Sequence, residues 1–238
     1  MYLLHFLHIL KKIILQEIIN NLYDIATNDW GRLVILYLIA RRDSHYFHPA
    51  LVEYLKLGDG NETSKKPADI RAKELLEGII DHLLQNISEQ LDKWLLNGSI
   101  QMVTLAALNN GFGPQLQAAF HSISKFITNA DSKLKTNDKE IRAIEDAGLH
   151  FFLKKLIQMD RKRIESNLCT FSEIILQYFT KEVLEYWTKF NRSCFLLVNL
   201  IENASENVVS ELTKKLKSLS NLRSEKSKGA AIILKKLQ

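Results

Sequence analysis

The side chains that could carry out catalysis or hold a metal are few and scattered along the chain. Two pairs among the seven histidines have the i, i+3 spacing that places both rings on one face of a helix, His5 with His8 and His45 with His48. Neither pair is accompanied by the ligands that would complete a zinc site. The two cysteines, Cys169 and Cys194, lie in apolar segments without a paired histidine, so we interpret both as reduced packing residues of an intracellular protein. We therefore predict no catalytic site, no metal, no cofactor and no small-molecule substrate.

Basic side chains are the chemistry that remains. The formal net charge is +5, and the whole excess lies from Glu206 onward. A basic end of this kind attracts a phosphate backbone or an acidic partner. The alternative interpretation is a solvated helix face, and charge by itself does not decide between the two.

The chain repeats one helical pattern, and most of its candidate residues lie in or beside a copy of it. A polar residue precedes a small one by two positions, and apolar residues follow the small one at +3, +4, +7 and +8, which is the spacing of one buried helix face. The small residues are Gly31, Ser99, Ser193 and Gly229, and a further copy fits near Gly148 if its positions are counted from Leu149. The polar residues, which would accept hydrogen bonds from the first helical turn, are Asp29, Asn97, Asp146, Asn191 and Ser227.

The apolar positions of these copies form the predicted core. In chain order they are Val34, Ile35, Leu38 and Ile39; Met102, Val103, Ala106 and Ala107; Phe152, Leu153, Leu156 and Ile157; Leu196, Leu197, Leu200 and Ile201; and Ile232, Ile233 and Leu237. A helix that buries one such stripe cannot fold alone, so the copies must stack. Only nine glycines and three prolines interrupt the chain. The sequence therefore predicts an all-α fold, an α-solenoid of stacked repeats.

The segments between the copies complete the predicted organisation. Residues 3–26 are expected to form one or two helices, residues 69–86 one helix, and the polar segment 128–139 a mobile loop. The helical segment between the first and second copies is an insertion. We assign residues 1–27 to the tail of a preceding repeat and residues 28–238 to the solenoid.

The apolar start of the chain could be taken for a signal peptide or a membrane anchor. Lys11, Lys12 and Glu17 interrupt it, and no small-residue cleavage site follows. We therefore predict an amphipathic helix there and no membrane partner.

Several segments together resemble a known protein family. They are Asp29–Val34, Leu36–Leu38 followed by Arg42 and Asp43, Gly58–Asn61 with Ser64–Lys66, and Arg71 with Glu74–Glu77. With these residues the chain resembles the C-terminal, Penguin-like half of the Pumilio homologue 3 / Penguin proteins, from about Asp24 to Leu237. The resemblance implies a solenoid of Pumilio-like three-helix repeats.

The positions that read bases in sequence-specific Pumilio repeats are altered in this chain. Such repeats present polar residues at +1 and +5, usually with Gln or Glu at +5. The pairs here are Arg32/Leu36, Ile100/Thr104, His150/Lys154, Cys194/Val198 and Ala230/Leu234. No copy has Gln or Glu at +5, which agrees with the Pumilio homologue 3 / Penguin branch.

The resemblance implies a function as well as a fold. It implies binding to structured or double-stranded RNA, or to DNA, through the backbone and with little sequence preference, in the nucleolus during assembly of the large ribosomal subunit. The alternative is a protein–protein scaffold that holds a ribosomal or assembly-factor peptide, and proteins of the pre-ribosomal particle are partners in either case.

Seven basic residues are the candidates for phosphate contacts. Arg32 and Arg192 lie beside the predicted caps, Arg41 and Arg42 at a helix end, Lys65 and Lys66 in the Gly58–Pro67 loop, and Lys228 before the last copy. Arg32, Arg192 and Lys228 hold related positions (+1, −1 and −1), so stacking should bring them towards one edge. For the loop, which matches neither a P-loop nor a calcium loop, the alternative is a plain connector between helices.

Overall fold

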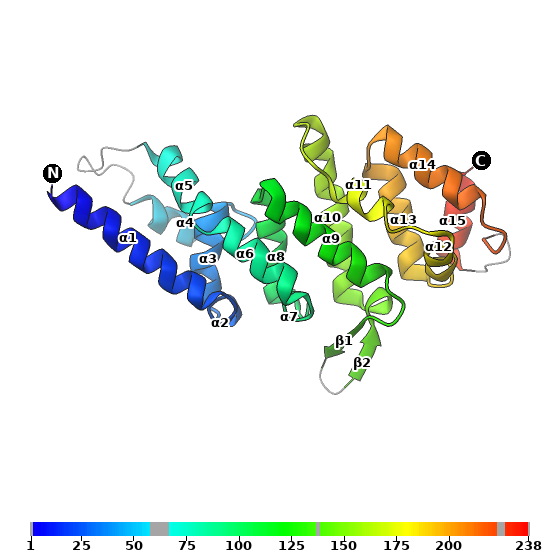
Figure 1. The fold of residues 1–238 in the computed structure, drawn as a ribbon, viewed down its shortest axis with the longest axis horizontal. Helices are drawn as coiled ribbons and strands as arrows, with labels where there is room; N and C mark the ends of the chain where they lie inside the picture. The colour runs from blue at the N-terminus through cyan, green and yellow to red at the C-terminus, as the bar shows by residue number, and fades with distance from the viewer. Residues whose placement is uncertain (1, 58–66, 137–138, 223–226, 238) are drawn as a thin grey trace. The chain divides into compact units, whose positions relative to one another are not determined.

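The structure is a computed structural model that describes residues 2–57, 67–136, 139–222 and 227–237. It confirms the predicted all-α fold (Figure 1), and its residues group into two compact units. Unit 1 contains residues 1–90 and 99–116, and unit 2 contains residues 91–98 and 117–238.

Unit 1 holds the first helices of the chain. They are α1 (Tyr2–Asn20), α2 (Leu22–Thr27), α3 (Gly31–Ala40), α4 (Pro49–Lys56), α5 (Ala68–Glu77), α6 (Ile80–Glu89) and α8 (Gly98–Asn110). Helix α3, the first copy of the repeated pattern, packs against α2 and α5. The glycine at its start is required, because a Cβ on Gly31 would lie 2.5 Å from the carbonyl oxygen of Ile25. The small residue at position zero thus permits the close approach of α2.

The cap of α3 is displaced by one residue from its predicted position. The side-chain oxygen of Asn28 accepts the backbone N–H groups of Trp30 and Gly31, at 3.0 and 2.9 Å. The predicted cap, Asp29, instead forms an ion pair with Arg32. An Asn one position earlier can reach the same free N–H groups, so residue type alone does not distinguish the two.

The segment expected to be one helix, residues 69–86, is two helices. Helix α5 ends at Glu77, and α6 starts at Ile80. Gly78 lies at the break, where its N–H still bonds to the carbonyl of Glu74, and glycine has a low helix propensity. The break lets Ile79, Ile80, Leu83 and Leu84 become fully buried.

Unit 2 contains three parallel helices that carry later copies of the pattern. They are α10 (Ala147–Glu165), α13 (Asn191–Asn203) and α15 (Lys228–Lys236), and α13 packs against both others (Figure 1). Their C-terminal ends lie together, because Arg161 donates to the carbonyl of Glu202 at 3.1 Å and Lys236 pairs with the Glu202 carboxylate at 2.9 Å. Their starts lie together as well, since the N–H of Gly229 donates to the Asn191 side chain at 2.9 Å. This side-by-side packing is the stacking that the repeats predict.

Unit 2 contains further elements besides these three helices. They are α7 (Leu91–Trp94), α11 (Phe171–Leu176), α12 (Lys181–Trp187), α14 (Glu206–Lys217), the 3-10 helix η1 (Ala143–Glu145), and most of α9 (Gly113–Thr128), which begins in unit 1. The polar segment 128–139, expected to be a loop, contributes to an antiparallel hairpin of β1 (Lys133–Thr136) and β2 (Lys139–Arg142). Lys133 pairs with Glu140 across it at 3.1 Å, and Leu134 is buried. The prediction was wrong because one buried leucine and cross-strand charge pairs stabilise an otherwise polar hairpin.

Two of the predicted caps are confirmed, and one residue has another role. Asp146 accepts the N–H of Leu149 at 2.7 Å, and Ser227 accepts the N–H of Ala230 at 3.1 Å. Asn191 lies inside the first turn of α13, where it binds Gly229 of α15 instead of its own helix. Helix α8 begins directly after Asn97.

Most of the predicted apolar stripe is buried, including Leu38 and Leu200, but two of its residues face solvent. Val34 is 47% exposed and Ile232 is 37% exposed. In each case the next residue, Ile35 or Ile233, is fully buried. Neighbouring residues on a helix point about 100° apart. Two consecutive residues of the stripe are therefore both buried only where the adjacent helices cover a wide part of the helix surface. Met102, Ile201 and Leu237 are half-buried for the same reason.

The contact between α13 and α15 makes a testable prediction about Gly229. A Cβ at this position would lie 2.4 Å from the Cβ of Cys194 and 3.0 Å from the carbonyl oxygen of Asn191. We expect Gly229→Ala to lower the free energy of unfolding by about 1–3 kcal/mol, because both obstacles belong to a rigid neighbouring helix. Chemical denaturation of the two proteins measures the difference.

Gly98 is the matched control for Gly229. It also begins a helix, yet a Cβ there would meet nothing within 4 Å. Gly98→Ala should leave the stability unchanged or slightly raised. Equal stability of the two alanine variants would contradict the close approach of α13 and α15.

Candidate nucleic-acid interface

The starts of the three parallel helices in unit 2 bring basic side chains together. Arg192 lies in the first turn of α13, and Lys228 is the first residue of α15, next to the Gly229 that binds Asn191. On α10, burial, followed by the charges of Arg192 and Lys154, lowers the pKa of His150 below its ordinary value. We call His150, Lys154, Arg192 and Lys228 the helix-start cluster. The structure thus brings the predicted residues Arg192 and Lys228 to neighbouring helix starts.

The helices themselves add to the positive potential of the helix-start cluster. The first N–H groups of a helix lack intrahelical acceptors, and the helix dipole is positive at this end. Three parallel helices present these ends side by side, and the side chains of Asp146 and Ser227 each accept one N–H group, at the starts of α10 and α15. Beside His150, the ring of Phe151 is 61% exposed, which offers an aromatic face next to the charges. Cations, helix starts and an exposed aromatic ring are the elements that bind phosphates and unpaired bases.

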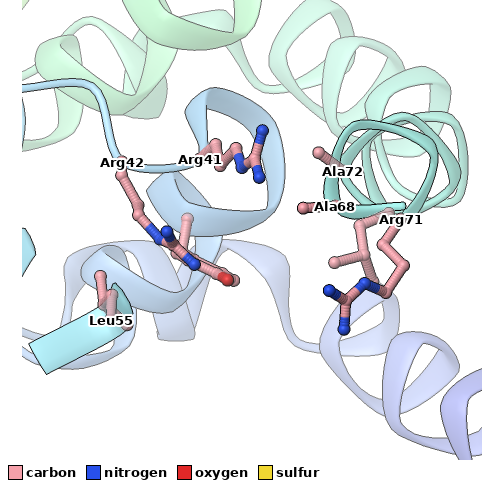
Figure 2. A pocket seen from close by; sticks show the side chains of 8 residues that line it. Arg41, Arg42, Leu55, Ala68, Arg71 and Ala72 are labelled. Atoms are coloured by element: carbon pink, nitrogen blue, oxygen red, sulfur yellow. The ribbon is translucent and has the colours of Figure 1, made fainter. Parts of the chain in front are cut away.

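A second set of basic residues surrounds a pocket in unit 1 (Figure 2). Arg41 and Arg42 follow the end of α3 on one side, and Arg71 extends from α5 on the other. The pocket has a volume of about 250 Å³ and is lined by Tyr37, Arg41, Arg42, Leu55, Ala68, Arg71, Ala72 and Leu75. We call it the arginine pocket. It brings together the predicted residues Arg41 and Arg42 and adds a third guanidinium.

The other predicted residues contribute less to either site. Arg32 lies in unit 1, and its guanidinium forms an ion pair with Asp29 at 2.6 Å, so its charge is already partly balanced. Lys65 and Lys66 lie outside the described residues. Their role as phosphate contacts, and the placement of Arg32 at an edge shared with Arg192 and Lys228, stay predictions.

Two members of these sites could have been found from the sequence, and one could not. His150 and Lys154 hold the +1 and +5 positions of the copy counted from Leu149, so their shared helix face is visible in the pattern. Arg71 carries no local signal, because its neighbour Arg41 is far away along the chain and only the packing of α3 against α5 brings them together.

The positions that read bases in sequence-specific Pumilio repeats are mostly buried in this chain. Leu36, Ile100, Thr104, Cys194 and Ala230 are each at most 1% exposed. They contact neighbouring helices and are not available to a base. Among these pairs, only His150 and Lys154 belong to a basic cluster near the surface.

Residues 2–57, 67–136, 139–222 and 227–237 contain neither a metal-ion cluster nor a membrane-spanning helix. Within these ranges, no group of three or more His, Cys, Asp or Glu side chains is placed to hold a metal ion. In the same ranges, every helix is too short or too polar to cross a membrane.

Known proteins share both the sequence and the fold. The CPL (NUC119) domain family matches residues 27–169, more than half of the chain. Pumilio homolog 3 of Danio rerio is 33% identical over 234 residues, which are 96% of this chain and 37% of that protein. Protein penguin of Drosophila melanogaster is 23% identical over 320 residues, covering 95% of this chain and 43% of that one. The chain thus spans well under half the length of these relatives.

Two crystal structures of human Puf-A have the same fold. The first superimposes with a TM-score of 0.81 at 29% identity and covers 94% of this chain and 43% of that one. The second, human Puf-A in complex with DNA, gives a TM-score of 0.79 at 28% identity and covers 92% of this chain and 42% of that one. These similarities confirm an α-solenoid of Pumilio-like repeats for the described chain.

Proposed function

The chain belongs to the Pumilio homologue 3 / Penguin family, and from this premise we propose that it binds nucleic acid through the phosphate backbone. The similar human Puf-A has been crystallised with DNA, which supports a nucleic-acid ligand. We propose structured or double-stranded RNA as the ligand, bound with little sequence preference. Assembly of the large ribosomal subunit in the nucleolus, alongside proteins of the pre-ribosomal particle, is the cellular setting that we propose.

The observation that carries this proposal is the helix-start cluster. A phosphate backbone presents one negative charge per nucleotide. A protein that binds the backbone therefore needs cations repeated at regular intervals along one edge of its surface. Arg192 and Lys228 are exposed and lie at the starts of two adjacent parallel helices. Lys154 lies close enough to His150 to lower its pKa, on the third helix of the set. This arrangement repeats a cation from one helix to the next.

The burial of most +1 and +5 positions supports the proposal that the chain binds with little sequence preference. Reading a base requires two or three exposed polar side chains at each repeat. Most of these positions are occupied by apolar or buried residues, such as Ile100 and Cys194. The contacts that remain are to phosphates, and such contacts carry no sequence information by themselves.

A charge variant of the helix-start cluster tests the proposal. We expect Arg192→Ala with Lys228→Ala to weaken binding to several structured RNAs of equal length by a similar factor. The slope of log affinity against log salt should fall by up to about two, roughly one for each lost phosphate contact. Filter binding at several salt concentrations measures both quantities.

A matched double variant, Lys214→Ala with Lys217→Ala, controls for net charge. Both lysines are exposed, lie in the last turn of α14 and do not belong to the helix-start cluster. This variant should keep nearly all of the affinity and the slope. Equal losses in the two double variants would contradict a localised interface, and selection of a sharp consensus motif would contradict sequence-independent binding.

A protein–protein scaffold is the second candidate function. It is favoured by the apolar face of α1, where Ile9, Leu10, Ile13 and Ile14 are each more than 40% exposed. Exposed apolar patches mark protein interaction surfaces. The salt titration separates the two candidates, because docking of a peptide on an apolar face does not weaken steeply with salt.

A further inference from the structure

The arginine pocket has a chemistry different from that of the helix-start cluster. The cluster lies along helix starts, whereas the pocket is a concavity of about 250 Å³ with three guanidinium groups in its lining. Its remaining walls are apolar or aromatic, formed by Leu55, Leu75, Ala68, Ala72 and Tyr37. An apolar wall with convergent charged groups is the usual form of a ligand site.

The lining of the pocket does not balance the charges of Arg41 and Arg71. None of the described residues that line it is acidic. Arg41 and Arg71 make no ion pair with any other residue in the described ranges, although neighbours such as Lys11 and Glu74 do pair, at 3.1 Å. Guanidinium groups bind phosphate oxygens with two parallel hydrogen bonds each. The pocket therefore suits a small anion with more than one charge and several oxygens.

The backbone at Arg41 indicates that this side chain is held in an unfavourable conformation. Its φ of 54° and ψ of −116° are those of the first central residue of a type II′ turn, which glycine normally occupies. The N–H of Asp43 closes the turn on the carbonyl of Ala40 at 3.2 Å. A residue other than glycine costs free energy at such a position, and strained residues of this kind cluster at ligand sites.

We propose that the arginine pocket binds the terminal phosphate of a nucleic-acid strand, an inference that rests on the proposed function. A phosphate inside the backbone carries one negative charge and continues into sugars on both sides, so it needs an open groove. A terminal phosphate monoester carries about two negative charges, presents three free oxygens and enters a pocket end-on. Three guanidinium groups around a concavity match the second ligand. The walls of Leu55 and Leu75 are then available to the last nucleotide.

The pocket thereby adds an end-specific contact to binding that is otherwise independent of sequence. Phosphoproteins carry the same dianionic group on serine, and a pocket for them would show the same chemistry. The similarity to a protein crystallised with DNA favours the nucleic-acid end.

The test compares strands that differ only at their ends. A short RNA hairpin is prepared with a 5′-phosphate, with a 3′-phosphate and with hydroxyl groups at both ends, and each form is titrated against the full chain by fluorescence anisotropy. We expect one phosphorylated form to bind about tenfold more tightly than the hydroxyl form, the size of a charge-assisted contact. The form that binds more tightly identifies the end.

Three variants assign the effect to the pocket. Arg71→Ala and Arg41→Gly should each abolish most of the advantage of the phosphorylated form over the hydroxyl form. Arg41→Gly suits the turn, so the fold is preserved when the guanidinium is removed. Lys73→Ala is the control, since Lys73 is an exposed cation on the same helix α5 that does not line the pocket. It should keep the full advantage.

The outcomes that overturn the inference are distinct from those that overturn the proposed function. Equal binding of all three strands, or an advantage that survives in Arg71→Ala and Arg41→Gly, overturns the terminal-phosphate site alone. So does pocket-dependent binding of a phosphoserine peptide without any effect of the RNA ends, which would assign the pocket to phosphoproteins. Absence of binding to every strand overturns the proposed function and this inference together.

Discussion

Asp160→Ala is expected to lower the free energy of unfolding by about 3–5 kcal/mol. Asp160 is fully buried in α10 and accepts the N–H groups at the start of α11, from Phe171 at 2.9 Å and from Ser172 at 2.8 Å. It also accepts the Ser172 hydroxyl. Alanine would leave these donors without their acceptor inside the protein and remove a negative charge near the buried guanidinium of Arg163. Chemical denaturation at neutral pH measures the loss.

Asp131 provides the control for this prediction. It is exposed, so Asp131→Ala should change the stability by less than about 0.5 kcal/mol. A loss of under about 1 kcal/mol for Asp160→Ala would show that water or a rearranged loop replaces the carboxylate, which contradicts its role in joining α10 to α11.

The same carboxyl predicts a pH dependence. Burial raises the pKa of Asp160 above its ordinary value, although the hydrogen bonds from Ser172 and Phe171 and the charge of Arg163 act against this. A raised pKa in the folded state means that the folded protein binds the proton more tightly than the unfolded chain. The part of its stabilisation that comes from proton binding is therefore fully present below the ordinary pKa of Asp and is lost as pH rises through the folded pKa. The stability difference between wild type and Asp160→Ala should widen on acidification from neutral pH.

Leu200→Ala is expected to cost about 2–5 kcal/mol of stability. Leu200 is 1% exposed in α13, which packs between α10 and α15. The variant loses the buried apolar surface and leaves a cavity that two flanking helices cannot readily fill. The midpoint of chemical denaturation should fall, with no change in the α-helical circular dichroism of the folded protein.

Leu168 is the matched control for Leu200. It is 49% exposed between α10 and α11, so Leu168→Ala should cost less than about 1 kcal/mol. If Leu200→Ala changed the stability by under about 0.5 kcal/mol, the stripe of α13 would not be core, and the repeat packing would be wrong.

The sequence by itself determined the features that depend on nearby residues. The helical class follows from the small number of glycines and prolines, and the burial of Phe152, Leu153, Leu156 and Ile157 follows from a period that any helix imposes. The caps Asp146 and Ser227 were predicted for the same reason. Each binds an N–H group three residues ahead, so its partner is fixed by chain geometry alone.

Only the tertiary structure decided which residues meet across the chain. Arg41 and Arg71 line one pocket because α3 packs against α5, and Asn191 binds Gly229 of α15 in place of its own helix. The exposure of Ile232 depends on how far α13 reaches around α15. Helical periodicity determines which residues share a face, but the burial of that face depends on the neighbouring helices, and the turns between helices determine which helices become neighbours.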